Sequence, residues 1–485
     1  MKSSASHHTP TVGSNQDVLL WTWALRMLLA TAFTALLARR LGVEDFGFVT
    51  LMGTYLLGLH VLMDLGTGVV ALREIVARPN EERTILGELT ALRLSLALAV
   101  AVLFAVLGLC EPSVARRGVL LSMAAFSPLL SLATGQIALQ KRLRPHLPAW
   151  VGVLTQASAL LLLWWLPFDG VALSGSLVAL LVFGRDLANG LVAWVAGQRQ
   201  VGAWILPRFR GGTFAWLRLA WPQGRFVLLQ LVWFHVDMPL MRWLCTEEEL
   251  GRYAAATRPV LPLLLIPSML MLPLLVRLTQ ATVDGAREVV AQASALLTGL
   301  GAMGFVAALF GAGELLELIY PASRAQDPHT IQAVRWLGLA FLAVFAAAAP
   351  LTALTARKRE RMLLWTGVVA VLLNVSANLI WTAAVGAEAA AAITACTELV
   401  VAIGACWCWQ RAGAPVLNLK LLGWALLPAS CLGLLLSVLT PSPWSVVFSI
   451  AMAVVLFGML PPLAKARRAL RQVDALRDIS GDGLT

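Results

Sequence analysis

Long apolar runs, bounded by charged residues or by proline and glycine, follow one another along most of the chain. Runs of about 20 apolar residues are long enough to cross a bilayer as α-helices. They are found at 17–39, 46–70, 88–109, 118–139, 148–166, 171–196, 222–243, 253–276, 289–310, 330–356, 363–384, 388–409, 421–439 and 444–464. The pattern predicts an all-α polytopic membrane protein with about 14 transmembrane helices.

The amino-acid composition also indicates a membrane protein, and it argues against several classes of function. Of the 485 residues, 59% are hydrophobic and only 13% are charged, whereas soluble domains carry about 25% charged residues. The spans leave no room for a soluble catalytic domain. The only close cysteine pair, Cys406 and Cys408, lacks the spacing of a metal site. We therefore expect no cofactor, no metal site and no catalytic residue, and no Walker loop or nucleophile triad is found.

The positive charge of the chain is distributed unevenly among the connections. With the N-terminus inside, the inner connections hold about three times as many Lys and Arg residues as the outer ones. The net charge of +11 is therefore a topology signal, and it does not indicate nucleic-acid binding. We expect both termini in the cytoplasm. The polar start of the chain and its long first span indicate no signal peptide.

The spans and connections also predict the domain organisation. We expect an N-terminal cytoplasmic tail, a six-helix lobe, an interfacial linker, a second six-helix lobe, two additional transmembrane helices and a basic cytoplasmic tail, at 1–16, 17–196, 197–221, 222–409, 421–464 and 465–485. The linker mixes tryptophan and phenylalanine with arginine, a composition that suits the headgroup layer of a membrane.

Two short segments repeat each other. The first span is followed by Leu41–Gly47 and the seventh by Cys245–Gly251, and in both segments acidic residues precede an apolar residue and a glycine. Acids favour the positive end of a helix dipole, so we expect a tight turn and new helices at Phe48 and Tyr253. Six helices separate the copies, which gives both halves the same orientation.

The residues around these segments resemble a known family. The resemblance is to bacterial oligosaccharide flippases of the multidrug/oligosaccharidyl-lipid/polysaccharide exporter superfamily. It is carried by Ala38–Gly47, Asp64–Gly66, Arg73–Glu74, Glu247–Gly251, Tyr253–Ala255 and Arg258. It is best over the first hundred residues and next best over 220–280.

The resemblance implies two six-helix lobes, related by a pseudo-two-fold axis along the membrane normal, plus two C-terminal helices. It implies alternating access that flips polyprenyl diphosphate-linked oligosaccharide from the inner to the outer leaflet of a bacterial cytoplasmic (inner) membrane, for surface polysaccharide biosynthesis. Membrane lipids, a polysaccharide polymerase and glycosyltransferases are the implied partners. The lipid II flippases carry an arginine in the second helix, whereas span two here offers His60 and Asp64, which argues against lipid II itself.

Arginines inside the spans are the candidate substrate ligands. A guanidinium stays protonated and can hold two phosphate oxygens, but burying it at a helix centre costs about 2.5–3.5 kcal/mol. Arg26 falls near the midplane of span one, Arg258 matches a headgroup-binding arginine of the family, and Arg185 lies in mid-span. Each could instead form a structural ion pair. Arg93 lies nearer a span end, where its side chain could extend to the interface.

Acidic and amide side chains in the spans are the remaining candidates. Asp64, Asp186, Asp237 and Glu398 could couple transport to an ion gradient, since carboxylates in a low-dielectric cavity can carry a proton. Asp64 could equally hold the helix turn at Leu65-Gly66. Because neighbours on a helix face different ways, we expect Arg185 and Asp186 to need separate partners. Asn374 and Asn378, four residues apart, could bind sugar hydroxyls or join neighbouring helices.

Two other functions compete with flipping. A drug or metabolite antiporter of the same superfamily would share the lobes, although the arginines disfavour a cationic drug. A membrane-embedded polysaccharide polymerase or ligase would also have many spans. Such enzymes typically resemble proteins with a large outer loop, whereas the longest outer connection here, 311–329, is short.

Overall fold

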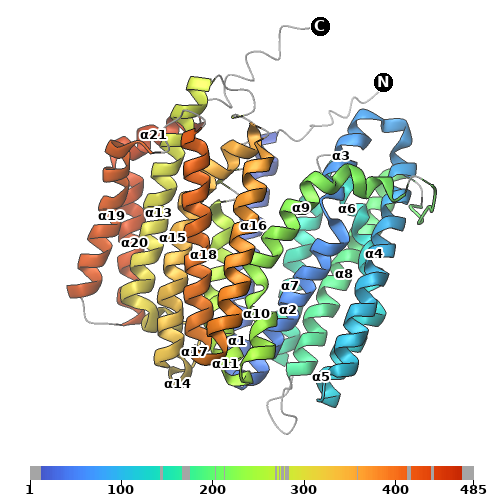
Figure 1. Cartoon of the computed structure of the whole chain (residues 1–485), viewed down its shortest axis with the longest axis horizontal. Coiled ribbons are helices and arrows are strands. Elements are labelled where there is room, and N and C mark those ends of the chain that lie inside the picture. The colour runs from blue at the N-terminus through green and yellow to red at the C-terminus, as the bar shows by residue number, and fades with distance from the viewer. Residues whose placement is uncertain are drawn as a thin grey trace, which may run out of the picture. The chain divides into compact units, whose positions relative to one another are not determined.

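The structure is a computed structural model in which every described regular element is a helix (Figure 1). It describes residues 12–141, 146–165, 175–202, 204–211, 213–267, 270, 271, 274, 278, 283–357, 359–411, 417–438 and 442–471. The predicted all-α class is confirmed. Most of the expected N-terminal tail, residues 472–485 of the basic tail and much of the second half of the expected span 253–276 lie outside the described residues.

The chain divides into two compact units, Met1–Leu228 and Leu229–Thr485. The first unit contains α1 (Val12–Arg40), α2 (Val43–Asp64), α3 (Thr67–Ala77), η1 (Pro79–Glu81), α4 (Glu82–Cys110), α5 (Val114–Phe126), η2 (Ser127–Thr134), α6 (Gly135–Lys141), α7 (His146–Trp165), α8 (Gly175–Val201) and the first part of α9 (Ala215–His235).

The second unit begins within α9. It continues with α10 (Asp237–Leu244), α11 (Glu247–Val260), η3 (Leu261–Leu265), α13 (Val283–Glu317), α14 (Ala322–Ala325), α15 (Pro328–Ala356), α16 (Glu360–Ala377), η4 (Asn378–Thr382), α17 (Ala383–Val385), α18 (Ala387–Arg411), α19 (Leu419–Val438), α20 (Pro443–Met459) and α21 (Pro461–Arg471).

In the described part of the chain, ten helices are long and apolar enough to cross a membrane, and two shorter apolar helices, Ala149–Trp165 and Pro443–Met459, match the expected spans 148–166 and 444–464. The chain is a multi-pass membrane protein. The count of 14 stays a prediction, because the expected span 222–243 is divided between α9 and α10 and the α-helix of the next span changes to 3-10 geometry at Leu261. Pro259 and Pro262 lack the amide hydrogen that would continue the α-helical bonding.

Close approach of small residues holds the helices of the first unit together. α6 packs on α8 where Gly135 faces Gly197, and a Cβ added at Gly197 would lie 2.6 Å from the Cα of Gly135. Lipid tails are as apolar as leucine, so membrane helices associate through such backbone contacts rather than by leaving water. α3, α4 and α6 form a hydrophobic core around Ile75, Leu86 and Leu89.

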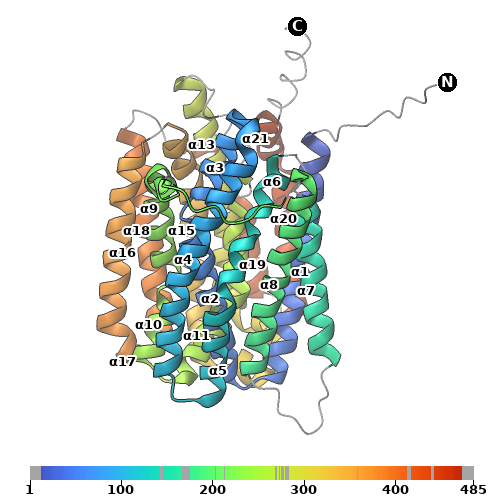
Figure 2. The same cartoon turned by 90° about the vertical axis from the view of Figure 1, so that its right-hand side faces the viewer.

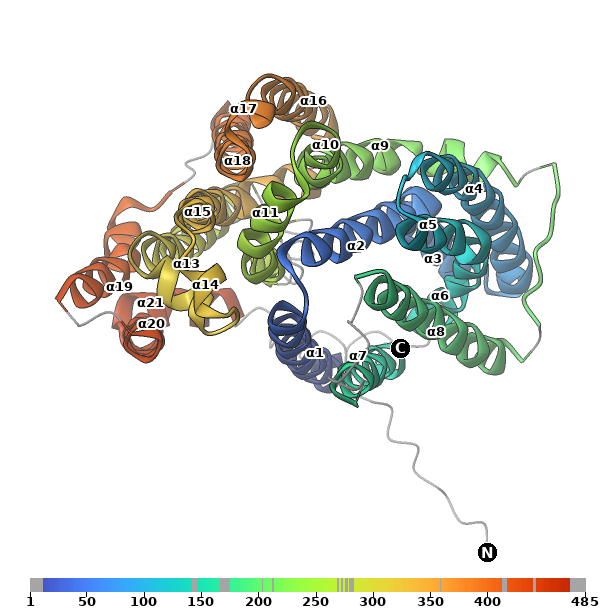
Figure 3. The same cartoon turned by 90° about the horizontal axis from the view of Figure 1, so that it is seen from below.

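In the second unit, α13, α15 and α18 form the central layer, with α13 packed on α15 and α15 on α18 (Figure 3). The two C-terminal helices α19 and α20 pack on α13 through a core that includes Ala425, Leu432 and Phe457. They therefore extend the unit on the α13 side.

The predicted internal repeat is present at the start of α2 and α11. Both helices have acidic residues in the first turn, and Thr246 caps α11 by accepting a hydrogen bond from the amide of Glu249. The helices begin at Val43 and Glu247, so the expected starts at Phe48 and Tyr253 are several residues late. The acidic residues therefore lie inside the first turn, where the unpaired backbone amides of the helix stabilise their negative charge.

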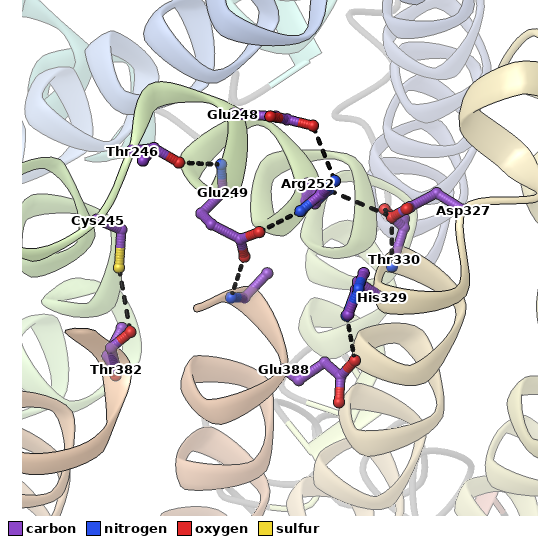
Figure 4. Close-up of polar contacts among 11 residues, drawn as sticks. Cys245, Thr246, Glu248, Glu249, Arg252, Asp327, His329, Thr330, Thr382 and Glu388 are labelled. Atoms are coloured by element: carbon purple, nitrogen blue, oxygen red, sulfur yellow. Dashed lines mark hydrogen bonds and ion pairs between the residues drawn. The ribbon is translucent and has the colours of Figure 1, made fainter. Parts of the chain in front are cut away.

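The same position of the repeat contacts the same element in each unit. Asp45 lies against Gly175 at the start of α8, where an added Cβ would be 2.9 Å from its carboxylate. Glu249 accepts a hydrogen bond of 2.8 Å from the amide of Ala387 at the start of α18 and pairs with Arg252 (Figure 4). In each unit, the acidic residue at this position of the repeat therefore lies beside the N-terminus of a later long helix, α8 or α18.

Candidate functional site

A polar cavity of about 410 Å³ lies inside the first unit, among α1, α2, α4, α8 and the η2–α6 segment. Its lining combines cationic, acidic and amide side chains with a few apolar ones: Arg26, His60, Met63, Asp64, Arg93, Leu130, Ala133, Gln136, Asp186, Asn189 and Gly190. Three of the residues that the sequence singles out, Arg26, Asp64 and Asp186, thus share one cavity.

Arg26 projects from α1 toward a glycine of α7. A Cβ added at Gly152 would lie 3.4 Å from its guanidinium, an ordinary van der Waals contact, so Arg26 lies directly against α7. Arg185 and Asp186 lie within electrostatic range. Among the described residues, however, Arg26 takes part in neither an ion pair nor a hydrogen bond of its guanidinium. The side chain of Arg26 is exposed and lines the cavity.

Asp64 holds the turn between α2 and α3. Its carboxylate accepts hydrogen bonds of 3.2 Å from the amides of Gly66 and Gly68, and Leu65 and Gly66 adopt left-handed backbone conformations. Asp64 also forms an ion pair with Arg93 of α4. The expectation that Arg93 extends to the membrane interface is wrong, because its side chain is only 11% exposed and is held by this carboxylate.

Arg185 and Asp186 bond to each other on α8. The guanidinium contacts the carboxylate at 2.8 and 2.9 Å and also donates to Gln156 of α7. The expectation that these neighbours need separate partners is wrong. The arginine side chain is long enough to fold back along the helix surface to the next residue, so the direction of the Cα–Cβ bonds does not keep the charges apart.

A second polar cluster is buried in the second unit around Asp237, the first residue of α10. Its carboxylate accepts hydrogen bonds from Tyr253 at 2.8 Å, Thr394 at 2.7 Å and Asn378 at 3.0 Å. Asp237 is 1% exposed, and among the described residues no Lys or Arg forms an ion pair with it. A buried carboxylate is thus surrounded by neutral donors alone.

Asn374 and Asn378 belong to this cluster. Both are completely buried; Asn374 donates to the backbone oxygen of Trp233, and Asn378 contacts Asp237 and Thr382. Asn378 opens η4, a single turn of π-helix, and such turns occur frequently at functional sites. Joining helices is what the two amides do in this structure, and their role toward sugar stays a prediction.

The last two candidates occupy the same unit. Glu398 of α18 is 2% exposed, and the charge of Asp237 acts on it. Arg258 lies in the last turn of α11 near Tyr320, at the connection between α13 and α14. Burial raises the pKa of Tyr320, and the guanidinium groups of Arg258 and Arg324 oppose this rise.

No group of three or more His, Cys, Asp or Glu side chains in the described residues could hold a metal ion. Around Asp237, one carboxylate, two amides and two hydroxyl groups form one hydrogen-bonded cluster, in which Tyr253, Thr394 and Asn378 donate to the carboxylate.

Comparison with known proteins decides the family. A family model described as polysaccharide biosynthesis protein matches residues 15–279, more than half of the chain. The chain belongs to this family. No curated protein matches it significantly in sequence.

Solved structures give the fold of this family member. The lipid II flippase MurJ, in an inward closed conformation, aligns with a TM-score of 0.73 at 12% identity, covering 95% of this chain and 100% of the flippase. An inward-facing multidrug resistance MATE family transporter of the MOP superfamily aligns with 0.59 at 16% identity, covering 82% and 98%. A Vibrio cholerae MATE transporter gives 0.52 at 15% identity, covering 82% and 97%.

These matches confirm the predicted fold, which the chain shares with a flippase and with transporters. The solved structures named above as similar to the chain are a lipid II flippase and two MATE transporters. At identities of this size the likeness concerns the fold, so the substrates named for those proteins are not transferred by it.

Sequence reasoning missed several residues of the two sites. Tyr253 and Thr394 donate hydrogen bonds to the Asp237 carboxylate, and Gln156 accepts one from Arg185. None of the three is among the candidate site residues that the sequence singles out. Tyr253 is one of only three tyrosines and lies two residues after the repeated segment Cys245–Gly251, a signal that could have identified it. Threonine and glutamine are too common in membrane helices to stand out.

Proposed function

We propose that this protein flips a polyprenyl diphosphate-linked oligosaccharide from the inner to the outer leaflet of a bacterial cytoplasmic membrane by alternating access. Membership of the polysaccharide biosynthesis family and the flippase fold support this proposal. The single observation that carries it is the Arg26 guanidinium, which lies in a polar cavity of the first unit without an ion-pair partner among the described residues.

The chemistry of the ligand follows from that guanidinium. A diphosphate cannot enter a low-dielectric interior unless its charge is met, and a guanidinium offers a fixed fork of donors to two phosphate oxygens. Gln136 and Asn189 line the same cavity and can bond to sugar hydroxyl groups. We assign the diphosphate to Arg26. Arg185 is held by Asp186 and contributes charge without direct contact.

Energy for turnover comes, in this proposal, from ion binding at Asp237. A buried carboxylate with only neutral donors is costly unless a cation or a proton joins it. Asn374, Asn378 and Glu398 lie in the same environment. Binding of a proton or a sodium ion there would bring α10, α11, η4 and α18 together, and release would loosen them. Asp64 and Arg93 have the structural role of bracing the α2–α3 turn.

Replacement of Arg26 in a strain that depends on this gene tests the proposal. Arg26→Ala is expected to abolish export of the surface polysaccharide at normal protein level. Arg26→Lys keeps the positive charge but lacks the two parallel N–H donors of the guanidinium, and is expected to retain part of the export. Arg335→Gln is the matched control, because Arg335 is also exposed but lies on α15 of the second unit, whereas the cavity belongs to the first. Full export by Arg26→Ala would remove the proposed role.

An ion-coupled drug or metabolite antiporter is the second candidate. It is favoured by one observation, the buried carboxylates of Asp237 and Glu398 in a fold shared with MATE transporters. Purified protein in vesicles separates the two. Flipping predicts translocation of a diphosphate-linked lipid without efflux of cationic dyes, and dye efflux dependent on Asp237 would favour the antiporter.

A further inference from the structure

The end of the connection between α8 and α9 and the first turns of α9, residues 204–211 and 213–221, form a two-sided segment that we call the strap. Figure 2 shows it running from α8 to α9 across α4. Ile205 and Trp216 face inward and belong to the hydrophobic core of α3, α4 and α6. The backbone amide of Arg208 donates to the carbonyl of Gly87 at 2.9 Å, and the indole of Trp216 donates to Glu88 at 3.0 Å. The strap is therefore fixed to the helices beneath it.

The outer side of the strap is apolar and aromatic. Trp204, Leu206, Phe209 and Phe214 are each between 59% and 63% exposed. Arg210 and Arg218 are exposed among them. A fixed backbone thus presents large rings and guanidinium groups on one side, while Ile205, Thr213 and Trp216 fill the other.

The depth of the strap follows from its contacts. It crosses α4 at Gly87, where a Cβ would lie 3.0 Å from the carbonyl oxygen of Leu206. Gly87 is within two turns of the start of α4, whose candidate span begins at Pro79. The strap therefore lies at the boundary between the apolar part of a spanning helix and water. Aromatic side chains and arginines favour this layer of a bilayer.

The charged residues in the sequence of the strap and its flanks are all basic. Between Asp186 and Asp237 the sequence contains five arginines and no acidic residue. Basic groups beside a membrane attract anionic headgroups by about 1 kcal/mol each, which corresponds to about fivefold in affinity. We propose that the strap binds anionic phospholipid headgroups, with Arg210 and Arg218 contacting the phosphates and the exposed rings inserted beside them. This inference does not depend on the proposed transport function.

Lipid titration of the purified full-length protein tests the proposal. Apparent affinity for phosphatidylglycerol is measured by native mass spectrometry, with phosphatidylcholine as the neutral reference. Arg210→Gln/Arg218→Gln is expected to lose about fivefold for each arginine, roughly 25-fold in all. The matched control, Arg39→Gln/Arg335→Gln, removes the same charge from two other exposed positions and is expected to stay within about twofold of wild type.

Two further measurements keep the test independent of folding. Arg210→Lys/Arg218→Lys keeps the charge and is expected to retain most of the affinity. Raising the salt concentration should weaken phosphatidylglycerol binding by the unmodified protein, because exposed charges are screened. Wild-type affinity in the glutamine variant, as expected if a protein partner covered the strap instead, would overturn the proposal. An equal loss in the control pair would also overturn it.

Discussion

Arg26 and Asp237 differ from Asp64, Arg93, Arg185 and Asp186 in how their charges are compensated. Asp64 with Arg93, and Arg185 with Asp186, form ion pairs inside the first unit. Arg26 lies in the cavity without such a pair among the described residues, and Asp237 is buried among neutral hydrogen-bond donors. We therefore assign the phosphorylated ligand to Arg26 and the coupling ion to Asp237.

Replacing Asp237 by asparagine tests its role as the coupling group. Asp237→Asn removes the charge and keeps the size of the side chain, so the protein should fold while transport loses its dependence on a proton or sodium gradient. The measurement is lipid translocation in vesicles with and without the gradient.

Asp284→Asn is the control for the loss of one carboxylate, since the side chain of Asp284 is 89% exposed. An Asp237→Asn protein whose transport responds to the gradient like wild type would disprove the assignment of this residue.

At the scale of elements, the acidic residue at the same position of the repeat lies beside the N-terminus of a later helix in each unit, and in the second unit a hydrogen bond joins the two. Asp45 of α2 lies against Gly175, the first residue of α8. Glu249 of α11 accepts a hydrogen bond from the amide of Ala387, the first residue of α18. Gly386, just before α18, has a φ of 75° and ψ of −139°, and a side chain there would overlap Glu249. Only glycine adopts this backbone without strain and leaves space for the carboxylate.

Neutralising Glu249 is expected to loosen this junction. Glu249→Gln weakens both the bond to the Ala387 amide and the ion pair with Arg252, and should destabilise the protein by about 1–2 kcal/mol. Thermal unfolding in detergent checks this. Glu248→Gln is the matched control, because Glu248 is 59% exposed and pairs only at the surface, where an ion pair contributes about 0–1 kcal/mol. Equal melting temperatures for the two variants would contradict the fastening role.

Sequence patterns were most informative for the elements and least informative for their contacts. Apolar runs locate spans such as α15 and α18 within a few residues, because every backbone group in lipid must bond within its own helix. The pairing of Arg185 with Asp186 was missed, since side-chain length rather than helix geometry decides it. The link between Asp237 and Thr394 joins residues far apart in sequence, which no single-sequence pattern encodes.

For the whole molecule, the bias of basic residues predicts which ends of the helices face the cytoplasm. Cysteine labelling in a background without native cysteines tests this orientation. Asn80→Cys lies in an expected cytoplasmic turn and Pro112→Cys in an expected outer one, and both positions are exposed. A membrane-impermeant maleimide should label position 112 and not position 80 in intact cells. The reverse pattern would invert the topology.

The central claim is that the protein moves a diphosphate-linked oligosaccharide lipid across a bilayer with the help of Arg26. The most direct measurement is translocation of such a lipid in vesicles that contain the purified protein, read by the access of an externally added enzyme to the sugar. The account predicts rapid translocation by wild type and by Arg335→Gln, and only the background rate by Arg26→Ala. Equal translocation by wild type and Arg26→Ala, or none by wild type in oriented vesicles with an imposed ion gradient, would contradict it.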